Sequence, residues 1–251
     1  MNPNKPIIAL DFATVEELID FIALFPEESL NLKIGMEMYY MTGPALVKQL
    51  IDQGHDIFLD LKLHDIPNTV KRSMSMLATL GISMVNVHAM GGSIMMEAAR
   101  QGLEEGTPEG RERPILLAVT QLTSTTQQQV NDEQLSQTPI DESVLHYASL
   151  TAKTGLDGVV CSPLETADIK TLLGQEFLTV TPGIRLTTEE ISGDDQYRIA
   201  TPSQAAQYGS DYIVVGRPIT RAKDPVKAYQ FIARQWQQAR DAYQARPQEE
   251  D

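Results

Sequence analysis

The stretch DIFLDLKLHDIPNT (56–69) begins as a β-strand whose side chains alternate between two faces. One face is entirely aliphatic and carries Ile57, Leu59, Leu61 and Leu63. The other face carries an aromatic ring followed by ionisable groups, those of Phe58, Asp60, Lys62 and His64. The aliphatic face can pack on helices, so we expect the second face to point into a barrel. Inward charges are costly unless they are paired, which leaves a purely structural ion pair as the alternative to a functional site.

Seven further short apolar segments recur along the chain at fairly even spacing. They span 6–12, 30–37, 83–89, 114–122, 157–163, 177–185 and 211–219. Between the strands lie segments with helical periodicity, of which the clearest are 14–25, 44–54, 141–155 and 224–244. Thr14 is the expected N-cap of the first of these helices, and Pro44 the first residue of the second.

Alternation of strand and helix predicts parallel strands that are joined by crossover helices. Eight such units in 251 residues fit a single α/β domain over 1–251, a closed (β/α)8 TIM barrel. An open, doubly wound sheet is the alternative, and periodicity alone does not exclude it. The polar tail 244–251 is expected to fray.

Composition excludes several classes of protein. The 20 Lys and Arg residues against 34 Asp and Glu give a net charge of −14, which repels phosphate backbones and argues against nucleic-acid binding. No apolar run reaches the ~18–20 residues of a membrane span, so we expect no membrane partner. The start of the chain lacks the features of a signal peptide, and Cys161 is the one cysteine. A reducing cytoplasm is therefore the expected location.

Charged residues gather at the predicted ends of the first three strands. These strands are neighbours in a barrel, so their upper ends bring together Asp11, Lys33, Asp60 and Lys62, with Asp65 just beyond. Alternating charges that are hydrogen-bonded in a row can keep each member ionised and rigid. A lysine held protonated beside an anionic reaction centre can act as an electrostatic stabiliser and a proton donor.

The last two strands each end in a glycine and an arginine, in TPGIR (181–185) and VVGRPIT (214–220). Loops after the seventh and eighth strands are the usual phosphate site of this fold. Gly216 would let backbone N–H groups approach an oxyanion, and Arg217 would add a two-pronged charged contact. Arg185 and Gln196 could close over the same group. The alternative is that the glycines only make turns and the arginines are solvated.

The histidines and Cys161 suggest no metal centre. We expect His88 to point inward, as either a hydrogen-bonded core residue or a catalytic one, and Cys161 to be a packed, unreactive thiol. The 4 histidines lack metal-binding spacing. Carboxylates at the strand ends could bind magnesium, but the interleaved lysines oppose this by supplying positive charge themselves.

The motif DLKLHDIPNT (60–69) resembles the signature of the orotidine 5′-phosphate decarboxylase family. Further segments typical of that family follow in the expected order across nearly the whole chain. They are ALD (9–11), LKIG (32–35), NVHAMGG (86–92), AVTQLTS (118–124), VCSP (160–163), VTPGIR (180–185) and VVGRPIT (214–220). The order of all these segments is far more specific than the D-x-K-x-x-D pattern alone.

The resemblance implies a cofactor-free, homodimeric enzyme that converts orotidine 5′-monophosphate to UMP and CO2, the last step of de novo pyrimidine nucleotide synthesis. It implies that Lys62 donates a proton to C6 and that Asp60 stands next to the departing carboxylate. It places Asp65 and Thr69 in the partner subunit's site. The remaining implied substrate contacts are Asp11 and Lys33 to the ribose, Thr123 and Ser124 near the pyrimidine, and Arg185, Gln196, Gly216 and Arg217 to the phosphate.

Two alternatives remain. Magnesium-dependent sugar-phosphate enzymes of the same barrel type share the D-x-K-x-x-D motif but carry an acidic residue where this chain has Lys33. A non-catalytic nucleotide-binding barrel would bind UMP without turnover.

Overall fold

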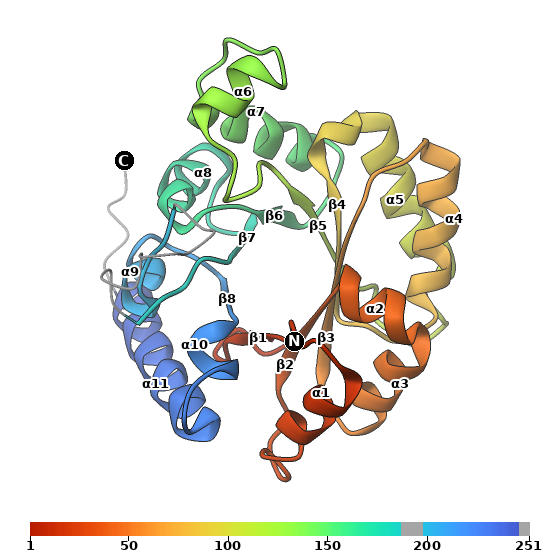
Figure 1. Cartoon of the computed structure of the whole chain (residues 1–251). Helices are drawn as coiled ribbons and strands as arrows, with labels where there is room; N and C mark the ends of the chain where they lie inside the picture. The colour runs from red at the N-terminus through yellow and green to blue at the C-terminus, as the bar shows by residue number, and fades with distance from the viewer. Residues whose placement is uncertain (187–197, 246–251) are drawn as a thin grey trace.

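Eight parallel strands form a closed barrel in chain order in the computed structural model, which describes residues 1–186 and 198–245 (Figure 1). The strands are β1 (Ile7–Ala9), β2 (Asn31–Gly35), β3 (Asp56–Leu63), β4 (Met84–His88), β5 (Ile115–Val119), β6 (Gly158–Val160), β7 (Leu178–Thr181) and β8 (Tyr212–Val215). All eight lie within the predicted segments. Pairing of β1 with β8, with Ile7 opposite Val214, closes the barrel and excludes the open sheet.

Helices follow the strands and cover the outside of the barrel. They are α1 (Val15–Ile22), α2 (Met36–Thr42), α3 (Pro44–Asp52), α4 (Pro67–Ala78), α5 (Gly92–Gly106), α6 (Gln127–Asp132), α7 (Ile140–Lys153), α8 (Thr166–Leu173), α9 (Pro202–Gln207), α10 (Arg217–Thr220) and α11 (Pro225–Gln244), with short 3-10 turns at Ala89–Gly91 and Pro163–Glu165. The predicted caps are confirmed: the Thr14 hydroxyl accepts from the Glu17 backbone N–H at 3.2 Å, and Pro44 opens α3.

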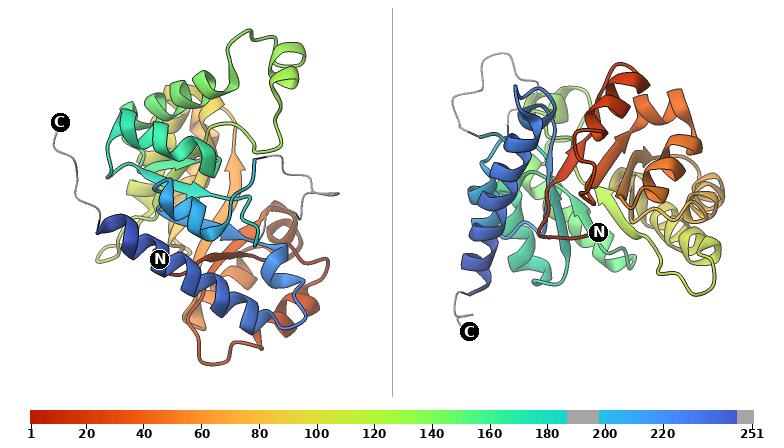
Figure 2. Two further views of the ribbon diagram at one scale, coloured as in Figure 1. Left: turned by 90° about the vertical axis from the view of Figure 1, so that its left-hand side faces the viewer. Right: turned by 90° about the horizontal axis from the view of Figure 1, so that it is seen from below.

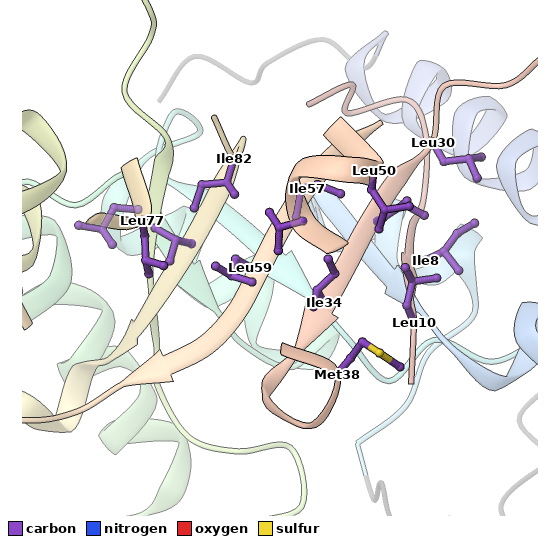
Figure 3. Close-up of a cluster of buried hydrophobic side chains, with 14 of the residues drawn as sticks. Ile8, Leu10, Leu30, Ile34, Met38, Leu50, Ile57, Leu59, Leu77 and Ile82 are labelled. Carbon is purple, nitrogen blue, oxygen red and sulfur yellow. The ribbon is translucent and has the colours of Figure 1, made fainter. Parts of the chain in front are cut away.

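Two apolar layers form the core, as the alternation in β3 predicts. Ile57 and Leu59 belong to the layer between the strands and the helices. Figure 3 shows this layer, where the strand residues Ile8, Ile34, Ile57 and Leu59 lie close to Met38, Leu50 and Leu77 of α2, α3 and α4. The barrel interior holds a second cluster, formed by Ile7, Ala9, Phe58, Met84, Leu117, Val180, Tyr212 and Val214. Phe58 thus lies inside, and Asp60 stands one inward position farther along the strand.

Close helix packing fixes the outer shell on both sides of the barrel. Helix α5 lies directly on α4 because Gly102 has no side chain; a Cβ there would come within 2.1 Å of the Lys71 carbonyl oxygen. Helix α11 runs beside the amino terminus (Figure 2, left), where the Trp236 indole donates to the Pro3 carbonyl at 2.9 Å. The predicted frayed tail begins at the end of α11, and residues 246–251 lie outside the described part. No described helix has the length and apolarity needed to cross a bilayer.

Candidate active site

A cavity of about 480 Å³ opens at the carboxyl ends of the strands. Nine of the residues predicted from the sequence line it: Asp11, Lys33, Asp60, Lys62, Thr123, Ser124, Arg185, Gly216 and Arg217. Lys33 lies in β2, and Asp60 and Lys62 lie in β3. Asp11 follows β1, and the Gly-Arg pairs follow β7 and β8. The fold therefore brings both halves of the predicted site to one cavity.

Four charged side chains form a continuous row at one side of this cavity. Asp60 is its centre, because one carboxylate oxygen lies 2.7 Å from Lys62 Nζ and the other lies 3.2 Å from Lys33 Nζ. Lys33 Nζ in turn lies 3.4 Å from Asp11 Oδ1. Asp60 is buried and Asp11 is exposed, so the row runs from the closed interior out to solvent.

The row holds its inner members in their ionised forms. Burial alone would raise the pKa of Asp60, but the ammonium groups of Lys33 and Lys62 outweigh burial and lower that pKa to about 2. For Lys33, burial would lower the pKa, but the carboxylates of Asp60 and Asp11 outweigh it and raise the pKa. At neutral pH the interior therefore presents a fixed carboxylate between two ammonium groups.

The backbone at Lys62 departs from an ordinary strand. Lys62 has a φ of +51°, which is uncommon for a residue with a side chain and costs roughly 1–2 kcal/mol. The pairing of β3 with β4 shifts register between Leu59 and Leu63, and Lys62 lies within that shift. The irregularity also corrects one prediction: alternation does not continue to His64, which is exposed and lines no described cavity.

Asn86 of β4 is a site residue that the sequence reasoning did not single out. Its side chain is fully buried, donates to Asp60 Oδ1 at 2.7 Å and accepts from the Lys62 backbone N–H at 2.8 Å. It shares the inward face of β4 with Met84 and His88; His88, which was predicted to point inward, is partly buried. An amide at an inward position of an otherwise apolar strand was the signal that could have identified it.

The other end of the cavity is built by the segments after β7 and β8. Gly183 has a φ of +80°. A parallel bridge pairs Ile184, just after β7, with Ala200, just before α9, so these two segments lie side by side. Arg185 is buried, and its guanidinium donates to the Ile184 carbonyl at 2.9 Å. Arg217 is exposed at the first position of α10. Gln196 lies outside the described residues.

Polar contacts join the loops after β5, β6 and β7. The Arg198 guanidinium forms an ion pair with the buried carboxylate of Glu165 and donates to the Leu122 carbonyl at 2.9 Å. Leu122 directly precedes the predicted pyrimidine contacts Thr123 and Ser124, so this guanidinium helps to place them. The sequence reasoning also missed Arg198, because its partners lie far away along the chain.

Three further predicted residues lie apart from this row. Asp65 and Thr69 are exposed at the start of α4, and neither lines a described cavity. The Asp65 carboxylate accepts from the Ile66 backbone N–H at 2.6 Å. Cys161 lines the cavity but is buried, and burial raises the pKa of its thiol to about 12, in keeping with the predicted unreactive role.

The sequence of this chain is similar to those of known proteins. Residues 4–232 match the model of the orotidine 5′-phosphate decarboxylase / HUMPS family. The chain belongs to this family. An orotidine 5′-phosphate decarboxylase of Listeria monocytogenes is 57% identical over 233 residues, which cover 93% of this chain and 99% of the relative. One from Lactococcus lactis is 55% identical over 239 residues, which cover 95% and 100%.

Two solved structures are similar to this chain in three dimensions. The crystal structure of orotidine 5′-phosphate decarboxylase from Lactobacillus acidophilus matches with a TM-score of 0.83 and 44% identity, over 92% of this chain and 98% of that one. An uncharacterised conserved protein from Geobacillus kaustophilus matches with a TM-score of 0.82 and 49% identity, over 92% and 99%. The resemblance that the sequence motifs predicted is confirmed, and the (β/α)8 barrel with it.

Proposed function

We propose that this protein decarboxylates orotidine 5′-monophosphate to UMP and CO2, the last step of de novo pyrimidine nucleotide synthesis. The observation that carries the proposal is the buried row of Lys33, Asp60 and Lys62 in the same cavity as two Gly-Arg pairs, in a member of this family. We place this biosynthetic activity in the cytoplasm.

The chemistry fits a site that works by electrostatics. Breaking the bond from C6 to the carboxylate releases CO2 and leaves an electron pair in the plane of the ring, where the π system cannot delocalise it. The Lys62 ammonium can stabilise that pair and then transfer a proton to C6, and solvent returns a proton to Lys62. Asp60 stands beside the leaving carboxylate and holds Lys62 Nζ at 2.7 Å, so little reorganisation is needed during the reaction.

The remaining lining residues provide binding. Asp11 and Lys33, at the outer end of the row, suit the ribose hydroxyls, and Thr123 with Ser124 suits the polar edge of the pyrimidine. At the far end, Arg185, Gln196, Gly216 and Arg217 would hold the 5′-phosphate, with backbone approach at the glycine and charge from the arginines. Binding energy from a phosphate remote from C6 can be used to assemble the reacting end.

We further propose a homodimer whose subunits complete each other's sites. Asp65 and Thr69 are polar and exposed, and neither is among the residues that line the described cavity of their own subunit. The segments that follow β2, β3 and β4 also carry exposed apolar side chains, those of Met36, Tyr40, Met41, Ile66, Met90 and Ile94. Apolar surface of this kind supports burial against a second copy of the chain.

Mixing inactive subunits tests this arrangement. A dimer of one Lys62→Ala chain and one Asp65→Ala chain contains one site with both residues intact if each site takes Asp65 from the partner. Activity should then reappear on mixing. If mixed dimers form and stay inactive, both residues act within one chain, and the shared site is wrong.

The decisive test of the reaction is the ultraviolet absorbance of orotidine 5′-monophosphate incubated with the purified protein in excess EDTA. Loss of the orotate absorbance with UMP as product is the expected result. Activity that EDTA abolishes and magnesium restores would instead favour a sugar-phosphate enzyme, although Lys33 Nζ lies between the Asp11 and Asp60 carboxylates, where a cation would need to bind. Tight UMP binding without turnover would favour a binding protein.

A further inference from the structure

The carboxamide of Asn86 joins the two central residues of the charged row. Its NH2 group donates to Asp60 Oδ1 at 2.7 Å, and its oxygen accepts from the Lys62 backbone N–H at 2.8 Å. A carboxylate oxygen can only accept and a backbone N–H can only donate, so the two partners fix the orientation of the amide. Asn86 is fully buried, and water does not compete for either bond.

The second of these bonds meets a need that the backbone creates. The register shift between β3 and β4 and the φ of +51° at Lys62 interrupt the regular pairing of the strands at this point. A buried backbone N–H without a partner is costly, and the Asn86 oxygen supplies that partner. Without it, Lys62 gains by leaving the left-handed region, and the change of φ would redirect its side chain relative to Asp60.

The hydrogen bond from the Asn86 NH2 group to Asp60 fixes the orientation of the Asp60 carboxylate. Asp60 Oδ1 receives both Lys62 Nζ and Asn86 Nδ2 at 2.7 Å, while Oδ2 faces Lys33. Hydrogen bonding from the amide also helps to lower the pKa of the Asp60 carboxyl. One side chain therefore sets both the plane of the carboxylate and the backbone that carries the ammonium group.

We propose that Asn86 is a positioning residue for the decarboxylation: it holds Lys62 in its left-handed conformation and orients Asp60 beside it, without contacting the substrate. This inference rests on the function proposed above. Only an amide of this length satisfies both partners, because a carboxylate lacks the donor and an aliphatic side chain lacks both groups.

The variant Asn86→Asp tests the donor half with almost no change of shape. At pH 8 the introduced carboxylate faces Asp60 Oδ1 in place of a donor, and we expect kcat to fall about 10- to 100-fold while UMP affinity changes less than about threefold. Lowering the pH protonates the introduced group, which restores a donor, so kcat relative to wild type should recover. The other ionisable groups around this point, Lys33, Lys62 and His88, are present in both proteins, and the ratio to wild type removes their contribution.

Asn31→Asp is the matched control. Asn31 is also a buried asparagine on a barrel strand, and its NH2 group donates to the Asn2 and Lys5 carbonyls at 2.7 and 2.9 Å, at the opposite end of the barrel. This control should lose stability but keep kcat and show no recovery at low pH. If Asn86→Asp matches it in kcat at every pH, or loses UMP affinity together with kcat and does not recover, the positioning role is wrong.

A crystal structure of Asn86→Ser tests the inference without activity and without a new charge. We expect Lys62 to leave the left-handed region and the contact between Lys62 Nζ and Asp60 to lengthen beyond 3.5 Å. Retention of both features would overturn the inference. An inactive wild-type protein, by contrast, would refute the proposed reaction, and the conformation of Lys62 in this variant would still decide the role of Asn86.

Discussion

The Asp60→Asn substitution measures how strongly the charged row is held together. The pKa of Asp60 falls from 3.8 to about 2, because Lys33 and Lys62 outweigh the effect of burial. At ~1.4 kcal/mol per pK unit, the ionised carboxylate contributes about 2 kcal/mol to the free energy of unfolding at neutral pH. The folded-state pKa is the lower one, so this contribution is complete above about pH 5 and is lost as the pH falls through 2. Roughly half of it should remain at pH 3.

Urea unfolding at one fixed protein concentration, at pH 7 and at pH 3, provides the assay. Asp60→Asn should be less stable than wild type by about 2 kcal/mol at pH 7 and by only about 1 kcal/mol at pH 3. Asp52→Asn removes an exposed carboxylate of α3 and is the control for loss of a charge as such. A difference between wild type and Asp60→Asn that stays the same at the two pH values would refute the depressed pKa, and with it the view that the lysines hold Asp60 ionised.

Three further substitutions or treatments address single residues. Lys62→Ala should lower turnover by about 10²-fold or more while UMP affinity, measured by calorimetry, stays largely intact; normal turnover would end the assignment as proton donor. Arg217→Ala should weaken UMP binding about tenfold or more but leave uridine binding nearly unchanged, and equal losses would argue against a phosphate contact. Burial raises the pKa of the Cys161 thiol to about 12, so iodoacetamide at pH 8 should leave the native protein unlabelled by mass spectrometry, whereas the urea-unfolded chain should react. Rapid labelling of the native protein would contradict the packed thiol.

Periodicity predicted the eight alternating strands and helices because each strand has its own apolar signal, but it did not exclude an open sheet, and the pairing of β1 with β8 decides for the closed barrel. Phe58 and Ile57 fall on opposite faces of β3 as alternation requires, and both are buried in their separate layers. The ends of the strands were harder to predict than the strands themselves. Every strand is shorter than its predicted apolar segment, because apolar side chains continue into the loops that follow or precede it. The alternation failed at His64 because a single residue, Lys62, adopts a left-handed conformation that no local pattern encodes.

Charge and position predicted the members of the site, but their connections depend on residues far apart in sequence. Lys33 and Asp60 could be placed together because consecutive strands are neighbours in a barrel. The role of Asn86 could not be predicted, because it depends on the register between β3 and β4. A shift of one residue in that register would place the Asn86 side chain on the face that packs against the helices. Arg198 is a similar case, because its partner Glu165 is identified only once the loops after β6 and β7 are seen to meet.

Strand β3 carries both a residue that stabilises the barrel and residues whose placement in the site is unfavourable by itself. Phe58 lies in the apolar interior layer, and Asp60 and Lys62 follow it at the open end. A buried carboxylate and a left-handed lysine would both be unfavourable alone, and each is held by partners from a neighbouring strand: Lys33 from β2 and Asn86 from β4. Because these partners belong to strands with fully buried apolar neighbours, the row cannot relax without disturbing the barrel. The fold therefore keeps a reactive arrangement of charges in place before any substrate arrives, which electrostatic catalysis requires.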